Sequence, residues 1–218
     1  MRSWKFVVPV LVIVLFASSA LAAGSSMSSS SSSSGNWTFG INGGGSFPTG
    51  DYGDKDVLGA GTGWNIGGQG DYWMSSMWGF GVDASYHANN AQDDFNTALV
   101  PIFGTGSEAK YSTIQYGAHA IFMIPTQGTQ VFPYLQGGVG GYNVKQKIEG
   151  GTTTSDESVN KFGVNIGAGV DFRATPVLNL GVGGTYHYVT KDEKIGDKAL
   201  NWFGVQARVN FKIPTSGK

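Results

Sequence analysis

Residues 162–173 of this chain alternate strictly between apolar side chains and small or polar ones. The even positions carry Phe, Val, Ile, Ala, Val and Phe, whereas the odd positions carry Gly, Asn, Gly, Gly, Asp and Arg. Successive side chains of a β-strand point to opposite faces, so this spacing predicts a strand with one apolar face. Residues 178–188 and 203–213 repeat the pattern, which indicates three consecutive strands of one design.

Five earlier segments follow the same alternation with more interruptions, which brings the number of expected strands to eight. None of the segments shows helical spacing. In the fifth, around Val131–Val144, the glycines leave the facing open and are compatible with a bulge. The apolar positions that mark the other four are Trp37, Phe39, Ile41, Trp64, Ile66, Tyr72, Phe80, Val82, Ala84, Tyr86, Ile114, Tyr116, Ala118, Ala120, Phe122 and Ile124.

The connections between these segments alternate in length. Short ones are expected at residues 74–77, 125–130 and 174–176, and long ones at 48–59, 88–109, 145–159 and 191–199. Outer-membrane barrels join their strands by short periplasmic turns and longer external loops. The pattern therefore predicts an all-β fold, an eight-stranded antiparallel up-and-down transmembrane β-barrel with both termini in the periplasm.

A soluble periplasmic barrel competes with this interpretation, because it also has one apolar and one polar face per strand. The low share of charged residues, 13%, favours lipid, since a soluble outer face carries abundant Lys and Glu. Aromatic residues near the segment ends also favour lipid, as girdles at the two membrane interfaces. The expected girdle residues are Trp37, Trp64, Trp73, Trp78, Tyr86, Tyr111, Tyr186, Tyr188, Trp202 and Phe211.

The N-terminal region predicts export. Arg2 and Lys5 precede an uncharged apolar run, and Ala20 and Ala22 supply small residues for cleavage, so residues 1–22 are expected to be a Sec-type signal peptide. Residues 23–35 are almost pure Ser and predict a flexible leader. The barrel is expected at residues 36–213 and a short tail at 214–218. With no Cys in an exported chain, disulfides and thiolate metal sites are excluded.

Two stretches resemble a known family. Gly43–Tyr52, with the sequence GGGSFPTGDY, looks like the junction of first strand and first loop in small eight-stranded outer-membrane proteins. Pro133–Gly140, with the sequence PYLQGGVG, resembles their fifth strand. The family is the outer-membrane β-barrel group that includes opacity-type, OmpX-like and OmpW-like proteins, and the likeness covers nearly all of residues 36–213. Members commonly end on an aromatic residue, whereas here Lys212–Lys218 follow Phe211.

The polar face of the segments predicts a lumen that polar side chains fill. An eight-stranded barrel is just wide enough for side chains, so the charges inside must pair or hold water. A pore gated by a pair such as Asp171 and Arg208 is the alternative. The expected lumen network comprises Asp71, Asp83, Asp171, Arg173, Arg208 and His119, with His87 and His187 added by the same parity.

Enzymatic activity is not expected. His87 and His187 near the external rim, with Asp93 and Asp94 in the second long connection, offer a base and a carboxylate, but no nucleophile motif accompanies them. Gly-x-Gly runs such as Gly181–Gly183 lie inside expected strands, so a dinucleotide site is rejected. Spacing supports neither a metal nor a cofactor. The net charge of −1 gives no footprint for nucleic acid.

The resemblance and the loop lengths together lead to one functional hypothesis and one alternative. We expect a structural or surface-interaction role, adhesin-like, in which the external loops meet a host or surface ligand. The alternative is a narrow porin-like channel for small or hydrophobic solutes, as the OmpW-like resemblance implies. In both cases the partners include outer-membrane lipid and the barrel assembly machinery, and the location is the cell outer membrane.

Overall fold

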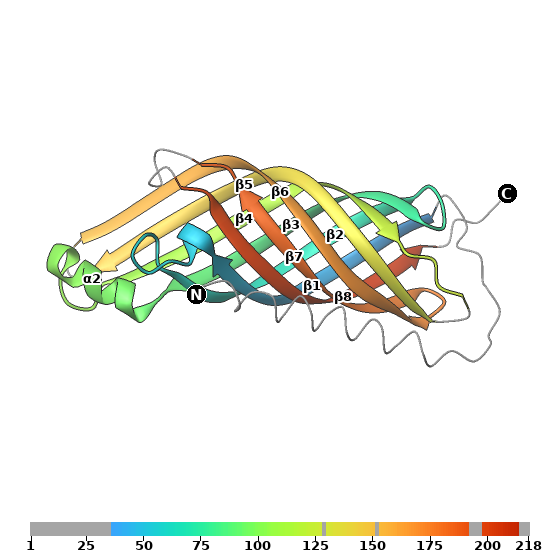
Figure 1. The fold of residues 1–218 in the computed structure, drawn as a ribbon, viewed down its shortest axis with the longest axis horizontal. Helices are drawn as coiled ribbons and strands as arrows, with labels where there is room; N and C mark the ends of the chain where they lie inside the picture. The colour runs from blue at the N-terminus through green and yellow to red at the C-terminus, as the bar shows by residue number, and fades with distance from the viewer. Residues whose placement is uncertain (1–35, 128–129, 151–152, 192–197, 214–218) are drawn as a thin grey trace, which may run out of the picture.

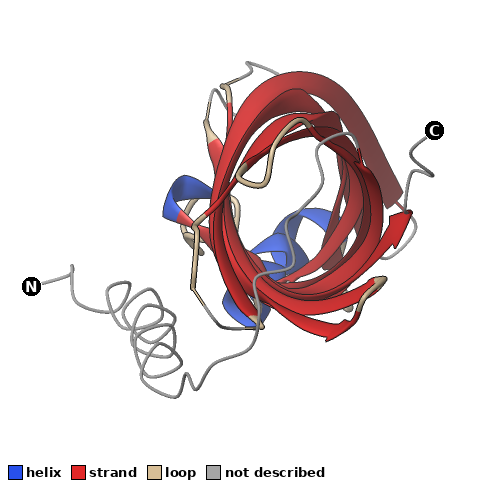
Figure 2. Ribbon diagram, turned by 90° about the vertical axis from the view of Figure 1, so that its right-hand side faces the viewer, coloured by secondary structure: helices blue, strands red, loops and turns tan. Residues whose placement is uncertain are grey.

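The computed structural model describes residues 36–127, 130–150, 153–191 and 198–213. Eight antiparallel strands form a closed barrel in which neighbours in sequence pair and β8 returns to β1 (Figure 2). The expected signal peptide with Ala20 and Ala22, the Ser-rich leader and the C-terminal tail lie outside the described residues. The elements are β1 Asn36–Thr49, η1 Gly50–Tyr52, β2 Ala60–Trp73, β3 Trp78–Ala91, α2 Asp93–Phe103, β4 Glu108–Met123, β5 Val131–Gly150, β6 Thr153–Thr175, β7 Leu178–Val189 and β8 Leu200–Ile213.

The apolar face of each strand points outward, as predicted. In β6 the side chains of Phe162, Ile166 and Phe172 are 57%, 67% and 44% exposed, while Asn165 and Asp171 on the opposite face are buried. Exposing this much apolar surface to water costs about 25 cal/mol per Å². Hydrocarbon removes that cost, so the outer face suits a bilayer. The eight-stranded antiparallel fold is confirmed.

The fifth strand has a definite facing that its sequence left open. β5 pairs with β4 and with β6 in continuous register from Tyr134 onward, with no bulge. Tyr134 and Tyr142 are buried inside the barrel, whereas Leu135 and Val139 are half exposed outside. Irregular register occurs instead in β2, between Ala60 and Gly63, and at the end of β6.

Three aromatic residues expected in the girdles are not there. Trp202 and Tyr111 are buried, and Trp73 turns inward to donate its indole N–H to Thr38 Oγ1 at 3.0 Å. The prediction that these three lie in the girdles was wrong because it followed the residue type and not the alternation of side chains along the strand. Trp202 lies on the same face as the inward residues Gly204, Gln206 and Arg208. The remaining seven are exposed on the outer face: Trp37, Trp64, Trp78, Tyr86, Tyr186, Tyr188 and Phe211.

One expected loop is a pair of strand extensions. Residues 145–159 were predicted to be a long connection, but β5 continues to Gly150 and β6 starts at Thr153. Pairing of β6 with β5 continues to Gly150–Thr153 and pairing of β5 with β4 continues to Glu108–Glu149, which carries this side of the sheet beyond β7 (Figure 1). Inward Val144 and Ile148 and outward Lys145 and Lys147 keep a period of two, which a strand satisfies. The strict alternation of long and short links therefore fails here.

A helix occupies the second long connection, where no helix was predicted. α2 buries Leu99 and packs Phe95 and Phe103 against the same apolar cluster, three residues at a spacing of four that lie on one helical face. Asp93 and Asp94 in its first turn complement the positive end of the helix dipole. Gly104, at a φ of 94°, ends it. Among the described residues, no helix has the length and apolar character to cross a membrane.

Candidate functional site

The barrel has two unlike ends. The turn end carries the short connections that follow β2, β4 and β6, and the loop end carries η1, α2 and the tips of β5 and β6 (Figure 1). In barrels of this kind the short turns are periplasmic and the long connections external. The lumen between these ends is the candidate site that the sequence predicted.

A histidine clamped by two carboxylates lies in the half of the lumen nearer the turn end. His119 Nε2 is 2.8 Å from Asp71 Oδ1, and its Nδ1 is 2.7 Å from Asp83 Oδ1. The two aspartates come from β2 and β3 and the histidine from β4. Both ring nitrogens donate only in the imidazolium form, which is the form this geometry fits. An imidazolium cation thus bridges two aspartate anions along one wall of the lumen.

A chain of hydrogen bonds continues from this clamp toward the loop end. The Gln115 amide N–H donates to Asp83 Oδ2, and the Ser85 hydroxyl donates to Gln115 Oε1 at 2.6 Å. The single hydroxyl proton of Ser85 is used in that bond, so its oxygen accepts from His87 Nε2 at 2.9 Å. The chain therefore fixes the orientation of Asp83, Gln115, Ser85 and His87 along the β3–β4 wall.

An ion pair occupies the opposite wall. The Arg208 guanidinium on β8 binds Asp171 on β6 in two places, Nε to Oδ1 at 2.7 Å and Nη2 to Oδ2 at 2.6 Å. Both side chains are buried, Asn210 donates a further hydrogen bond to Asp171, and the Tyr134 ring lies 3.7 Å from the guanidinium carbon. A two-pronged pair with a stacked ring is among the strongest charge pairs proteins form.

Inward glycines make the room that these charges need. A Cβ on Gly81 would overlap Asp71 Oδ1 and approach His119, and a Cβ on Gly181 would overlap Asp171 Oδ1 and crowd Arg208. The glycine-rich polar face therefore has a packing reason: eight strands enclose little space, and ionised side chains take it. We call Asp71, Asp83, His119, Asp171 and Arg208 the charged half of the lumen.

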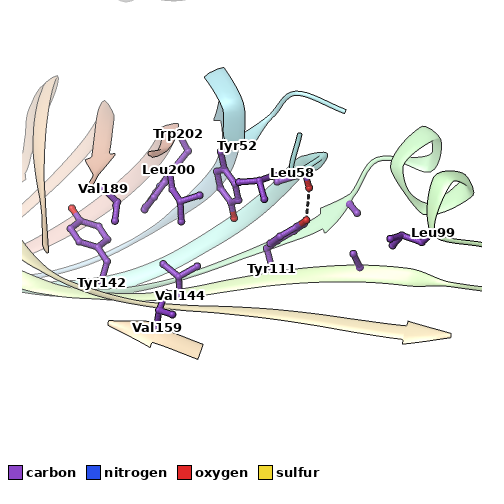
Figure 3. Close-up of a cluster of buried hydrophobic side chains, with 13 residues drawn as sticks. Tyr52, Leu58, Leu99, Tyr111, Tyr142, Val144, Val159, Val189, Leu200 and Trp202 are labelled. Atoms are coloured by element: carbon purple, nitrogen blue, oxygen red, sulfur yellow. Dashed lines mark hydrogen bonds between the residues drawn. The ribbon is translucent and has the colours of Figure 1, made fainter. Parts of the chain in front are cut away.

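The loop end of the lumen is filled differently. A cluster of buried apolar side chains closes it, drawn from η1, the following loop, α2 and the seven strands β2 to β8 (Figure 3). Tyr111 donates its hydroxyl hydrogen bond to the Leu58 carbonyl, which ties the loop to β4. We call this cluster the apolar cap, and it comprises Tyr52, Leu58, Ala60, Ala91, Leu99, Ala109, Tyr111, Tyr142, Val144, Val159, Val189, Leu200 and Trp202.

A layer of aromatic rings joins the two halves. His187 stacks on Trp202, with ring centroids 4.8 Å apart and planes 11° from parallel, and His87 meets both edge-on at 5.3 Å. The Tyr142 hydroxyl lies 3.2 Å from His187 Nδ1. The Nδ1 atom of His87 and the indole nitrogen of Trp202 are buried with no partner within the described residues.

The predicted lumen residues fall into three places. Asp71, Asp83 and His119 form the clamp, and Asp171 pairs with Arg208. Arg173 lies apart, nearer the turn end, with its guanidinium carbon 4.7 Å from the Phe132 ring centre.

Sequence reasoning missed the apolar cap altogether. The expectation of a lumen filled by polar side chains was therefore wrong for the loop end. The available signal for it was the apolar character of Tyr142, Val144 and Ile148, which occupy even positions of β5 on the inner face of the barrel.

The arrangement around the histidines does not resemble a catalytic rim. His87 and His187 are buried among aromatic rings, whereas Asp93 and Asp94 are exposed on α2. In the part of the chain that the structure describes, no group of His, Asp and Glu is suited to hold a metal ion. Chemically, the described lumen pairs charges and packs apolar side chains together.

Comparison with known proteins identifies the fold and the family. Neisserial surface protein A is similar, with 19% identity, 81% of this chain and 97% of that chain covered, and a TM-score of 0.55. The attachment invasion locus protein Ail of Yersinia pestis is 18% identical over 83% of this chain and 100% of that chain, with a TM-score of 0.50. A major outer membrane protein of Thermus thermophilus is 10% identical over 81% of this chain and 99% of that chain, with a TM-score of 0.54. No curated protein matches the sequence. The family described as outer membrane protein beta-barrel domain matches residues 11–212, so this chain is a member of that family.

Proposed function

We propose that this outer-membrane barrel is a surface-interaction protein, adhesin-like in role, whose loop end meets a ligand outside the cell. The observation that carries the proposal is the sheet of β4, β5 and β6 that continues beyond β7 (Figure 1). Pairing between β6 and β7 begins only at Gly163–Val189, so residues 153–160 pair with β5 on one side and with no described strand on the other. Such an edge is a template for an extended segment of another chain.

The strand geometry supports an assignment of the backbone groups that a partner strand would contact. The Phe162 carbonyl accepts a hydrogen bond from the Thr190 N–H, so Phe162 turns its backbone groups away from β5. Backbone groups alternate sides along a strand. Asp156, Ser158 and Asn160 therefore turn theirs to the unpaired edge, while Glu157 and Val159 bond to β5.

A relative gives support by analogy of fold. Ail of Yersinia pestis, named for attachment and invasion, has been solved in complex with the heparin analogue sucrose octasulfate. The filled lumen argues in the same direction, because a barrel closed by an ion pair, a clamped histidine and an apolar cap offers no continuous path for a solute. Catalysis and a cofactor form no part of the proposal.

Adhesion of cells that display the full-length protein tests the proposal. Such cells are expected to bind surfaces coated with heparin or with extracellular matrix protein several-fold more than cells without it. Ser158→Pro removes a backbone N–H donor from the unpaired edge and should therefore abolish the gain in adhesion. The variant is expected to fold, since edge strands tolerate proline. Thr97→Ala on the exposed face of α2 is the control that should retain it. Equal adhesion with and without the protein would contradict the role.

Planar-bilayer recordings separate the proposal from the channel alternative. The purified protein is expected to show no discrete conductance steps, because side chains fill both halves of the lumen. Reproducible steps that survive in the Ser158→Pro variant would instead favour a narrow channel.

A further inference from the structure

A hollow of about 320 Å³ opens on the outer wall of β3, β4 and β5, near the base of the extended sheet. Its walls include three lysines, Lys110, Lys145 and Lys147, and one acidic residue, Asp156. Tyr86 and Ala88 line it on the side toward the membrane. It therefore combines an apolar floor with a cationic wall.

Strand register places the lysines relative to the membrane. Tyr86, whose ring packs against Trp64 in the outer girdle, lies in one cross-strand row with Ile114 and Asn143. The next row of outward side chains contains Lys145, and the row after it contains Lys110 and Lys147.

Each row advances two residues, about 6.7 Å along a strand. The lysines therefore start beyond the outer girdle, on the side of the loop end. Lipid headgroups occupy this level, where an aromatic girdle ends and water begins.

The charges in the hollow are held loosely enough to exchange partners. Lys110 Nζ and Lys147 Nζ both reach Glu149, at 3.2 Å and 2.5 Å, and about half of each lysine side chain is exposed. Exposed ion pairs of this kind contribute little. Lys145 forms no ion pair within the described residues. The neighbouring Glu149 and Glu108 carboxylates raise the pKa of Lys110, so its charge persists at any physiological pH.

We infer that this hollow binds the phosphate monoester of an outer-leaflet lipid. A phosphate takes the place of Glu149 between Lys110 and Lys147 and gains Lys145 as a third donor, and hydrogen bonds to ionised groups are the stronger ones. The acyl chains of the same molecule continue down over Tyr86 and Ile114 into hydrocarbon. This continuity favours a lipid over a soluble polyanion, because a polyanion has no apolar part that could contact the floor of the hollow.

Native mass spectrometry of the detergent-solubilised, full-length protein with added phosphatidic acid tests the site. One phosphatidic acid is expected to remain bound, and phosphatidylglycerol, a diester, to bind more weakly. Lys145→Ala with Lys147→Ala should weaken phosphatidic acid binding about tenfold, since each lost donor served an ionised group. Glu149→Gln removes the carboxylate that Lys110 and Lys147 share and should tighten binding two- to threefold, about the size of an exposed ion pair.

Controls separate this inference from other sources of the same chemistry. Lys55→Ala with Lys198→Ala removes two exposed lysines elsewhere at the loop end and should leave binding unchanged. Inorganic phosphate should compete poorly. Retention that is equal in the wild type and the Lys145–Lys147 variant overturns the site, as does lysine-dependent binding of sucrose octasulfate without lipid binding. Ser158→Pro should not alter lipid binding, so failure of adhesion and failure of this site are distinguishable.

Discussion

The charged half of the lumen and the apolar cap fill one barrel by opposite means. In the charged half, side chains that water would solvate are buried and must therefore satisfy one another, as Arg208 and Asp171 do. In the apolar cap, side chains such as Leu200 and Val144 need no partners and only have to fit. The charged half lies where lipid surrounds the barrel, and the cap lies where the strands extend beyond the membrane.

The difference shows that the surroundings of a barrel decide what fills it. Within the membrane, the apolar residues of each strand turn outward to lipid, and parity leaves the polar ones to the lumen. Above the girdle the outer face meets water, so Lys145 and Lys147 turn outward and Val144 and Ile148 turn inward. A strand that crosses this boundary reverses the character of both faces without changing its period.

Breaking the Arg208–Asp171 pair should have the largest effect. Arg208→Met leaves Asp171 buried and unpaired, which costs about 3–5 kcal/mol of unfolding free energy. Urea unfolding in phospholipid vesicles, followed by tryptophan fluorescence, measures the loss. Asp171→Leu together with Arg208→Met should recover most of it, because no lone charge remains. A double variant as unstable as the single one would contradict a cost that arises from the unpaired charge.

Truncation in the apolar cap should come next. Leu200→Ala leaves a cavity in a site that is 1% exposed, and such changes cost about 2–5 kcal/mol. Ile102→Ala, at a position 76% exposed, is the matched control and should change stability by less than about 0.5 kcal/mol. If the two halves are independent, the losses of Leu200→Ala and Arg208→Met add.

A methyl group in the charged half should disturb it moderately. In Gly181→Ala the new Cβ displaces Asp171 or Arg208, and overpacking of this kind costs about 1–3 kcal/mol. Gly137→Ala on the outer face is the control, because its Cβ would meet only a carbonyl at 4.0 Å. Equal stability of the two variants in the same urea titration would show that the lumen has spare room.

Alkaline pH should weaken the cap through Tyr52. Burial, with a smaller contribution from Tyr111, raises the pKa of the Tyr52 phenol above its ordinary value of 10.0. The folded state therefore favours the neutral phenol, and this stabilisation is present below pH 10.0 and is lost as the pH rises through the folded-state pKa. Tyr52→Phe should lose less stability than the wild type over that range. Identical pH profiles would contradict the burial of this hydroxyl.

The surface of the loop end should tolerate change. Lys55 Nζ lies 3.2 Å from Asp94 Oδ2, and both side chains are more than half exposed. Solvent screens such a pair, so Lys55→Gln should leave the urea midpoint unchanged within error. A clear shift would mean that the loop after η1 is held to α2 by charge as well as by the packing of Phe95.

Much of the barrel was predictable because alternation and geometry share one period. The outward row of β6 follows directly from the order of Phe162 to Phe172, and the same parity places Asp171 and Arg208 inside. Parity would also have placed Trp202 inside, had the preference of tryptophan for interfaces not outweighed it. Which aspartate meets His119 was not predictable, since depth in the lumen depends on the register between strands.

The sequence alone determined the number of strands, the apolar faces of most of them and which charged residues face the lumen, because side-chain direction in a strand is a local property. Tertiary structure decided the partners and the closure: the clamp on His119, the stacking of His187 on Trp202, and the cap that α2 completes. These contacts join residues far apart in the chain, and pairing register and strand length set them. The local sequence pattern contains neither the pairing register nor the strand length.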